Sequence, residues 1–179
     1  CVDSNELFID GLEIPVEDRI GEEGKGFKYL LHGMNPERVL LAAEAVGVGR
    51  IALRKATGYA AERKVFDRPI GMNQAIQHPL ARNWVELEAA QLLTAKAAWL
   101  YDNGRECGAE ANAAKYYAAE AGFRACEQAI LTHGGMGYSK EFHVERYLRE
   151  IMIPRIAPVS RELILSHIAE RVLGLPKSY

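Results

Sequence analysis

Two neighbouring stretches decide how the middle of this chain folds: residues 132–138, with the sequence THGGMGY, and residues 141–146, with the sequence EFHVER. Because glycine has no Cβ, the pair Gly134–Gly135 lets the backbone come close to something flat or bulky. The pair ends a long helical pattern, and the charged stretch after it begins a new helix. Such a break between helices is a good place to hold a large ligand.

Helical patterns extend in both directions from this break. From residue 27 to about residue 63 the chain reads as helix, and Asn35-Pro36-Glu37 predicts a helix start, because a capping side chain is followed by proline and an acid. Further helices are expected over about 74–101, 110–132, 144–150 and 159–173. Short loops between helices predict an antiparallel bundle. The small residues at 42, 43, 45, 47 and 49 suggest close helix contacts.

The first twenty residues follow a different pattern. Residues 6–20 alternate apolar and polar positions around Gly11 and Pro15, which predicts a short β hairpin or the end of a strand. This is too little to form a sheet alone. The expected fold is therefore mostly α, an antiparallel up-down helical bundle with a short β remnant at the N-terminus. We expect residues 1–24 to be the end of a β domain with its linker, and 25–179 to be the helical domain.

Composition narrows the function classes. A net charge of −2 provides no electrostatic reason to expect nucleic acid as a partner. No apolar run is long enough to span a bilayer. Three cysteines, an odd number without metal-ligand spacing, indicate reduced thiols in an intracellular compartment. The absence of an initiating methionine suggests a piece of something longer.

Several residues are candidates for chemistry, and each has a simpler structural interpretation. Glu37 beside Arg38 could be a general base in a cleft, or an acid facing a helix N-terminus. Arg63, Phe66 and Gln74 could bind a phosphate-bearing cofactor, or form a solvated helix end. His133 is interpreted as a hydrogen-bonded structural group rather than a metal ligand. Cys126, Trp84 and Trp99 are interpreted as core residues.

The pattern Gly-Gly-x-Gly-Tyr, followed after a few residues by Val-Glu-Arg, resembles the C-terminal helical domain of acyl-CoA dehydrogenases, and the likeness covers nearly the whole chain. It implies an FAD cofactor. Arg63 and Phe66 match the family's Arg-x-x-Phe, Gln74 matches its glutamine, and these contact FAD, typically across a subunit interface. Gly134 and Gly135 match the flavin-adjacent glycines. Leu131 stands where the family usually has a second glutamine.

The resemblance also bears on the catalytic base. Many members carry a glutamate before the last helix, where this chain has Pro158, which in addition lacks a backbone N–H. Isovaleryl- and long-chain-type members place the base in a Glu-Arg pair at the start of the first long helix, which matches Glu37-Arg38. The resemblance therefore implies Glu37 as the base, Arg38 as its electrostatic support on the substrate side, and Ser160 as a hydroxyl offered to FAD.

The function that this resemblance implies is α,β-desaturation of an acyl-CoA thioester, with electrons leaving to an electron-transfer flavoprotein. The implied assembly is a homo-oligomer, a dimer or tetramer, in the cytoplasm or the mitochondrial matrix, with neither nucleic acid nor a membrane span. Two alternatives remain open: an acyl-CoA oxidase or other flavin oxidase of the same superfamily, and a helical assembly module without catalysis. The Pro158 substitution favours the second alternative somewhat.

Overall fold

The computed structural model describes residues 5–178. The chain divides into two compact units, Cys1–Gly33 and Met34–Tyr179. Within the described part of the first unit there is no strand, so the predicted β hairpin is wrong. Its one regular element before the first α-helix is a 3₁₀-helix, η1 (Val16–Asp18). The apolar side chains that were expected to lie on a sheet are exposed. A single strand without a partner cannot satisfy its backbone hydrogen bonds.

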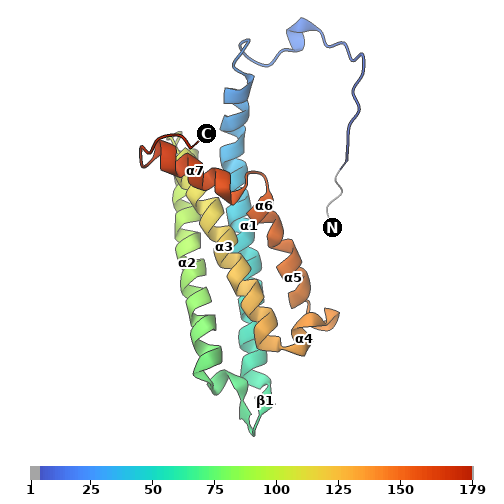
Figure 1. Ribbon diagram of the computed structural model, residues 1–179, viewed down its shortest axis with the longest axis vertical. Helices are drawn as coiled ribbons and strands as arrows, with labels where there is room; N and C mark the ends of the chain where they lie inside the picture. The colour runs from blue at the N-terminus through green and yellow to red at the C-terminus, as the bar shows by residue number, and fades with distance from the viewer. Residues whose placement is uncertain (1–4, 179) are drawn as a thin grey trace. The chain divides into compact units, whose positions relative to one another are not determined.

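Three long helices dominate the second unit (Figure 1): α1 (Gly26–Glu62, counted from Met34 onward), α2 (Gln74–Asp102) and α3 (Gly108–His133). Between α1 and α2 lie a two-stranded antiparallel turn, β1 (Lys64–Val65) with β2 (Arg68–Pro69), and the 3₁₀-helix η2 (Ile70–Met72). After α3 come α4 (Gly135–Tyr138), η3 (Lys140–Phe142), α5 (Val144–Glu150), α6 (Met152–Ile156) and α7 (Arg161–Arg171). The prediction of a mostly helical bundle is confirmed.

The start of the first helix differs from its prediction. Pro36 lies inside α1, which begins at Gly26 and continues through the proline. Proline removes one backbone donor from a helix, yet a long helix that is packed on its neighbours tolerates the loss. Glu37 is therefore not beside a positive helix end, and the interpretation of Glu37 as an acid facing a helix N-terminus is wrong.

Close backbone contacts hold the three long helices together. A Cβ added to Gly122 of α3 would come within 2.6 Å of the Ala45 carbonyl oxygen of α1. A Cβ on Gly49 of α1 would lie 3.0 Å from the Gly122 Cα and 2.6 Å from a methyl group of Leu87 in α2. Small residues at these crossings let the helices approach closely, as the sequence suggested for Ala42, Ala45 and Gly49, whereas Ala43 and Gly47 are exposed. Fully buried alanines line the same seam, and Cys126 lies among them as predicted.

The two tryptophans do not belong to this core. Trp84 and Trp99, both on α2, are 58% and 54% exposed. Their assignment as core aromatics is wrong, because α2 carries apolar side chains around much of its surface while only one side faces α1 and α3. Leu92, which shares the predicted apolar face, is also exposed. Over residues 5–178, no helix combines the length and apolar character needed to cross a membrane.

Candidate functional site

The glycine break at the end of α3 uses three glycines for three different reasons. Gly134 ends the helix with a φ of 61° and a ψ of −135°, a conformation that other residues rarely adopt. Gly137 lets α4 fold back on α3, because a Cβ there would lie 2.5 Å from the Ile130 carbonyl oxygen. Gly135 is under neither constraint: its φ is not in the left-handed region, and a Cβ there would meet no atom within 4 Å. The open space beside Gly135 is therefore available to a ligand.

A cluster of three aromatic rings packs next to the glycine break at the end of α3. The His133 ring stacks on Tyr59 of α1 with centroids 4.3 Å apart, and Phe142 packs edge-on against both rings. His133 Nδ1 donates to the Ala129 carbonyl oxygen at 2.7 Å, and the residue is buried. The sequence interpretation of His133 as a hydrogen-bonded structural group is confirmed. Among the described residues no group of three potential metal ligands is present.

An open groove of about 530 Å³ lies over this cluster. It brings Arg63, from the end of α1, together with Gly134 and Gly135, more than seventy positions later in the sequence. The other lining residues come from the same two regions: Tyr59, Val65, Ile70, Leu131, Thr132, His133 and Met136. Two elements far apart in the chain thus form one concave surface with a single guanidinium and a Cβ-free floor.

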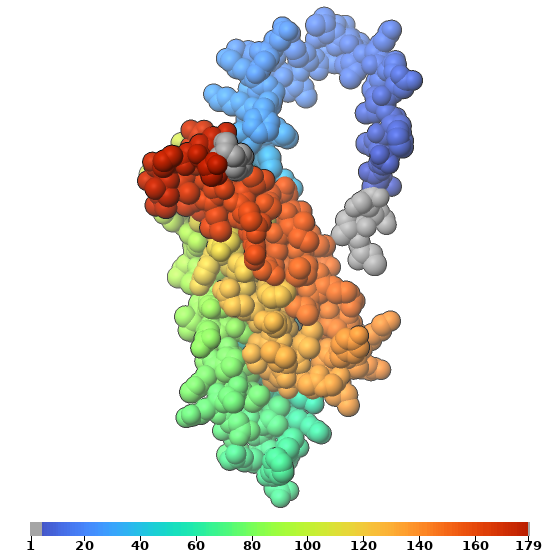
Figure 2. Space-filling view, viewed as in Figure 1, coloured from blue at the N-terminus to red at the C-terminus, as the bar shows by residue number. Residues whose placement is uncertain are grey.

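Two predicted cofactor residues stand outside this groove. Phe66, at the tip of the β1–β2 turn, is 93% exposed and has a φ of 53°. Gln74 is the first residue of α2 and is also exposed. Figure 2 shows the teal segment around residues 60–70 standing out at the end of the long helices, next to the green start of α2. The described part of the chain therefore leaves the Phe66 ring almost entirely uncovered.

Glu37 and Arg38 lie near the other end of the long helices. Glu37 is exposed, whereas Arg38 is only 7% exposed. The Arg38 Nη1 donates to Asn35 Oδ1 at 3.0 Å, and its Nε is buried without a hydrogen-bond partner among the described residues. Burial lowers the pKa of Arg38, and the neighbouring Glu37 carboxylate opposes this effect. An unpaired buried donor beside an accessible carboxylate is a feature that requires an explanation.

Lys115 of α3 lies beside Arg38 and was not singled out from the sequence. Its side chain is 1% exposed, and its Nζ donates to the Val159 carbonyl oxygen at 2.6 Å. Burial and the positive charge of Arg38 lower the pKa of Lys115 to about 8, with Glu162 acting in the opposite direction. Ser160, the next residue after Val159, caps α7 by accepting a hydrogen bond from the backbone N–H of Leu163 at 3.3 Å.

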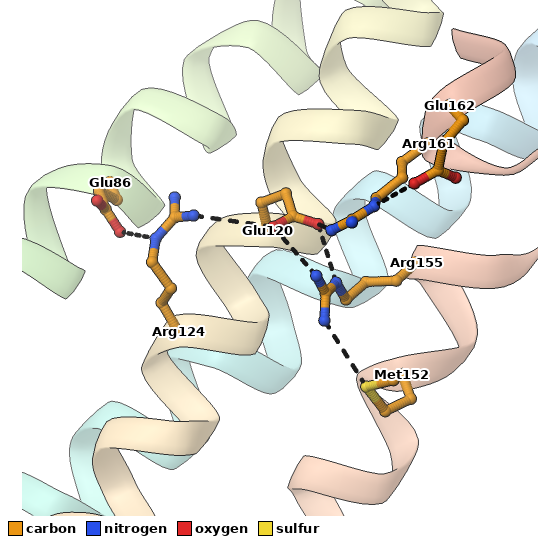
Figure 3. Close-up of polar contacts among 7 residues, drawn as sticks. All are labelled: Glu86, Glu120, Arg124, Met152, Arg155, Arg161 and Glu162. Carbon is orange, nitrogen blue, oxygen red and sulfur yellow. Dashed lines mark hydrogen bonds and ion pairs between the residues drawn. The ribbon is translucent and has the colours of Figure 1, made fainter. Parts of the chain in front are cut away.

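A second α3 residue, Glu120, binds arginines on both sides of Val159–Ser160 (Figure 3). Its carboxylate accepts hydrogen bonds from Arg155 of α6 at 2.9 Å and from Arg161 of α7 at 3.4 Å. Arg124 lies 4.0 Å from the Glu120 carboxylate and donates to Glu86 of α2 at 2.8 Å. The network thus links α2, α3, α6 and α7.

The structure therefore divides the predicted site residues into two groups. Arg38 and Tyr59 lie about 30 Å apart on α1, given a rise of about 1.5 Å per residue. Glu37, Arg38 and Ser160 belong to the end marked by Lys115, and the arginine–glycine groove belongs to the other.

The sequence contains a signal that could have singled out Lys115. This lysine falls on the buried face of α3 with Ala111 and Ala118, at helical spacing from both. A lysine at such a position is rarely buried without a specific partner.

Comparisons with known proteins agree with this architecture. Residues 24–173 match the family model described as acyl-CoA dehydrogenase, C-terminal domain. An acyl-CoA dehydrogenase of Mycobacterium bovis, FadE12, is 46% identical over 176 residues, which is 97% of this chain and 45% of that protein. The chain thus spans about half the length of such relatives.

Solved structures give the same picture. A glutaryl-coenzyme A dehydrogenase in complex with glutaryl-CoA superimposes with a TM-score of 0.89 and 35% identity, over 96% of this chain and 44% of that one. The prolyl acyl carrier protein oxidase AnaB superimposes with a TM-score of 0.86 and 33% identity, over 90% and 43%. Since the family model covers most of the sequence and the folds coincide, this chain belongs to the acyl-CoA dehydrogenase family and contains its C-terminal domain.

Proposed function

We propose that the full-length protein is an FAD-dependent acyl-CoA dehydrogenase that introduces a double bond between the α and β carbons of an acyl-CoA thioester. Glu37 is the base that takes the α proton. The observation that carries this assignment is the position of the Glu37–Arg38 pair, which lies at the same end of the helices as Lys115 and the Val159–Ser160 turn. Pro158, adjacent to that turn, has no carboxylate to offer.

The residues at the two ends fit an FAD cofactor in different ways. The groove offers the Arg63 guanidinium, which suits a phosphate, and a floor without Cβ atoms at Gly134 and Gly135. At the other end, the Ser160 hydroxyl accepts from Leu163 and keeps its own proton available to donate. When bound, FAD supplies the acceptor for the two electrons that leave the substrate.

One copy of this chain cannot bring both ends to one cofactor. The ends lie about 30 Å apart along α1, and Phe66 and Gln74 are exposed. Assembly of two copies resolves this, with one subunit contributing Ser160 and the next contributing Arg63, Phe66 and Gln74. We therefore propose a homo-oligomer, a dimer or tetramer. The partner that receives the electrons is proposed to be an electron-transfer flavoprotein.

Arg38 supports the base in this proposal. Its buried guanidinium lies next to the Glu37 carboxylate, and its free Nε is a donor that no described residue uses. The same donor is available to a polar group of the substrate, which would satisfy it on binding.

Substitution of the base tests the proposal. In the full-length protein, Glu37→Gln should lower the turnover of an acyl-CoA by about three orders of magnitude, since a general base contributes about 10² to 10⁴ in rate. The visible flavin absorbance should be unchanged. Glu44→Gln is the matched control, because Glu44 is an exposed glutamate on the same helix. Near-normal turnover in Glu37→Gln would refute the assignment of the base.

The likeness to a prolyl acyl carrier protein oxidase supports a second candidate, an oxidase that passes electrons to oxygen. The two candidates share every residue discussed above and differ only in the electron acceptor. Oxygen consumption by the full-length protein, compared with reduction of an artificial dye under nitrogen, separates them. Rapid dye reduction with little oxygen uptake is the expected result.

A further inference from the structure

Among the described side chains that are less than 2% exposed, Lys115 is the largest. Placing an ammonium group in such surroundings costs free energy unless a specific interaction offsets it. Its one hydrogen bond to the described chain goes to a backbone carbonyl, that of Val159, and not to a carboxylate. Arg38 adds a second positive charge nearby, which makes the position still less favourable for a cation. The ammonium group of Lys115 is thus buried in unfavourable electrostatic surroundings.

The hydrogen-bond partner of Lys115, the Val159 carbonyl, lies next to a predicted cofactor residue. Val159 directly precedes Ser160, so the peptide plane that contains the Val159 carbonyl also contains the Ser160 N–H. Fixing that plane fixes the positions of the Ser160 N and Cα atoms, and the cap conformation of Ser160, with a φ of −62° and a ψ of 152°, then sets where its side chain lies. The first turn of α7 depends on the same residue, because Leu163 N–H donates to Ser160 Oγ at 3.3 Å and Ile164 N–H donates to the Ser160 carbonyl oxygen at 3.1 Å.

Glu120 restrains the same segment on both flanks. Arg155 precedes the Val159–Ser160 turn and Arg161 follows it, and both bind the Glu120 carboxylate, as Figure 3 shows. Arg155 also packs over the Phe123 ring at 4.2 Å. Glu120 therefore limits where residues 155–161 lie on α3, while Lys115 sets the orientation of the central peptide.

We propose that Lys115 is a positioning residue, which orients the Val159–Ser160 peptide so that the Ser160 hydroxyl donates to the flavin. This inference rests on the proposed function, because it requires FAD at this end of the helices. Lys115 touches neither substrate nor flavin and acts through Ser160.

The test is Lys115→Met in the full-length protein, with two readouts. Amide hydrogen exchange at Leu163 and Ile164 should become at least about tenfold faster, because the first turn of α7 loses its anchor. The visible absorption band of bound FAD should shift, and adding Ser160→Ala to Lys115→Met should cause no further shift. Lys96→Met is the matched control, since Lys96 also pairs with an α3 residue but is 61% exposed. It should change neither readout.

Each outcome decides one part of the proposal. If wild-type protein binds no flavin, the proposed function itself is wrong. If flavin binds but exchange at Leu163 and Ile164 is unchanged in the variant, the anchoring role is wrong. If exchange accelerates while the flavin band stays in place, or if the two substitutions shift the band additively, action through Ser160 is wrong.

A second variant keeps the proposal testable should Lys115→Met not fold. Lys115→Leu, whose apolar side chain is favoured by burial, is then measured by the same criteria. Faster exchange and a shifted flavin band are expected, because leucine offers no donor to the Val159 carbonyl. An exchange rate within about twofold of wild type together with an unshifted band in Lys115→Leu would overturn the proposal.

Discussion

The two ends of the α1–α3 bundle differ in how far their candidate functional side chains are buried. At the Lys115 end, the side chains of Lys115 and Arg38 are buried and donate to Val159 and Asn35, while Arg38 Nε has no partner among the described residues. At the groove end the functional candidates face outward, and Phe66 is 93% exposed. The first end is organised before any ligand or subunit arrives. In the proposed oligomer the second offers half of a binding surface, which another subunit completes.

This difference shows how one helical domain can present two differently organised surfaces to the proposed cofactor. A buried, hydrogen-bonded end keeps its geometry without a partner, because the interior is close-packed. An exposed end can adapt to a partner, since the side chains there have few neighbours that restrict their rotamers. The long helices act as the rigid spacer between them, and their close crossing at Gly49 and Gly122 keeps the distance constant.

Breaking the crossing should damage both ends and has the largest expected effect. In Gly122→Ala the new methyl group would meet the Ala45 carbonyl oxygen, a backbone atom that cannot rotate away. We expect the full-length protein to lose about 3 kcal/mol of unfolding free energy, measured by urea denaturation. Gly47→Ala, in the interior of α1 with no atom within 4 Å of the new Cβ, should instead raise stability by about 0.5–1 kcal/mol, because alanine has the higher helix propensity. Equal stability of the two variants would contradict the description of the crossing.

A pH series sharpens the comparison at the buried end. The pKa of Lys115 is about 8 in the folded protein and 10.5 in the unfolded chain. Between these values the unfolded chain binds more protons, so the free energy of unfolding rises with pH in this window. From pH 8 to pH 10 we expect the difference between wild type and Lys115→Met to move in favour of wild type by about 2 kcal/mol. Taking the difference cancels groups that titrate equally in both proteins, and a flat difference would show that Lys115 titrates normally.

At the groove end a small substitution should weaken only cofactor binding. Gly135→Ala adds one methyl group to open space at an ordinary backbone conformation, so folding stability should not fall and should rise by about 0.4–1 kcal/mol through the lower entropy of the unfolded chain. FAD affinity of the full-length apoprotein should fall about tenfold, equivalent to about 1.4 kcal/mol, as followed by flavin fluorescence. Gly47→Ala again serves as control. Unaltered affinity in Gly135→Ala would remove the glycine floor from the proposed binding surface.

The sequence by itself determined the helical part of the fold. Helical spacing and the turn residues between segments predicted α2, α3 and α5 to within about two residues, because periodicity and glycine are local signals. The Gly134–Gly135 break was also visible locally. The same local signals were misleading at Pro36, where packing carries α1 through a proline, and at residues 6–20, where alternation alone cannot form a strand.

The tertiary structure decided which residues meet. Arg63 joins the glycine pair, and Lys115 joins Val159, only because helices distant in sequence lie side by side. It also decided that Trp84 is exposed while Lys115 is buried, the reverse of what their side chains favour. The physical reason is that burial depends on which face of a helix its neighbours cover, and a one-dimensional pattern does not contain the positions of those neighbours.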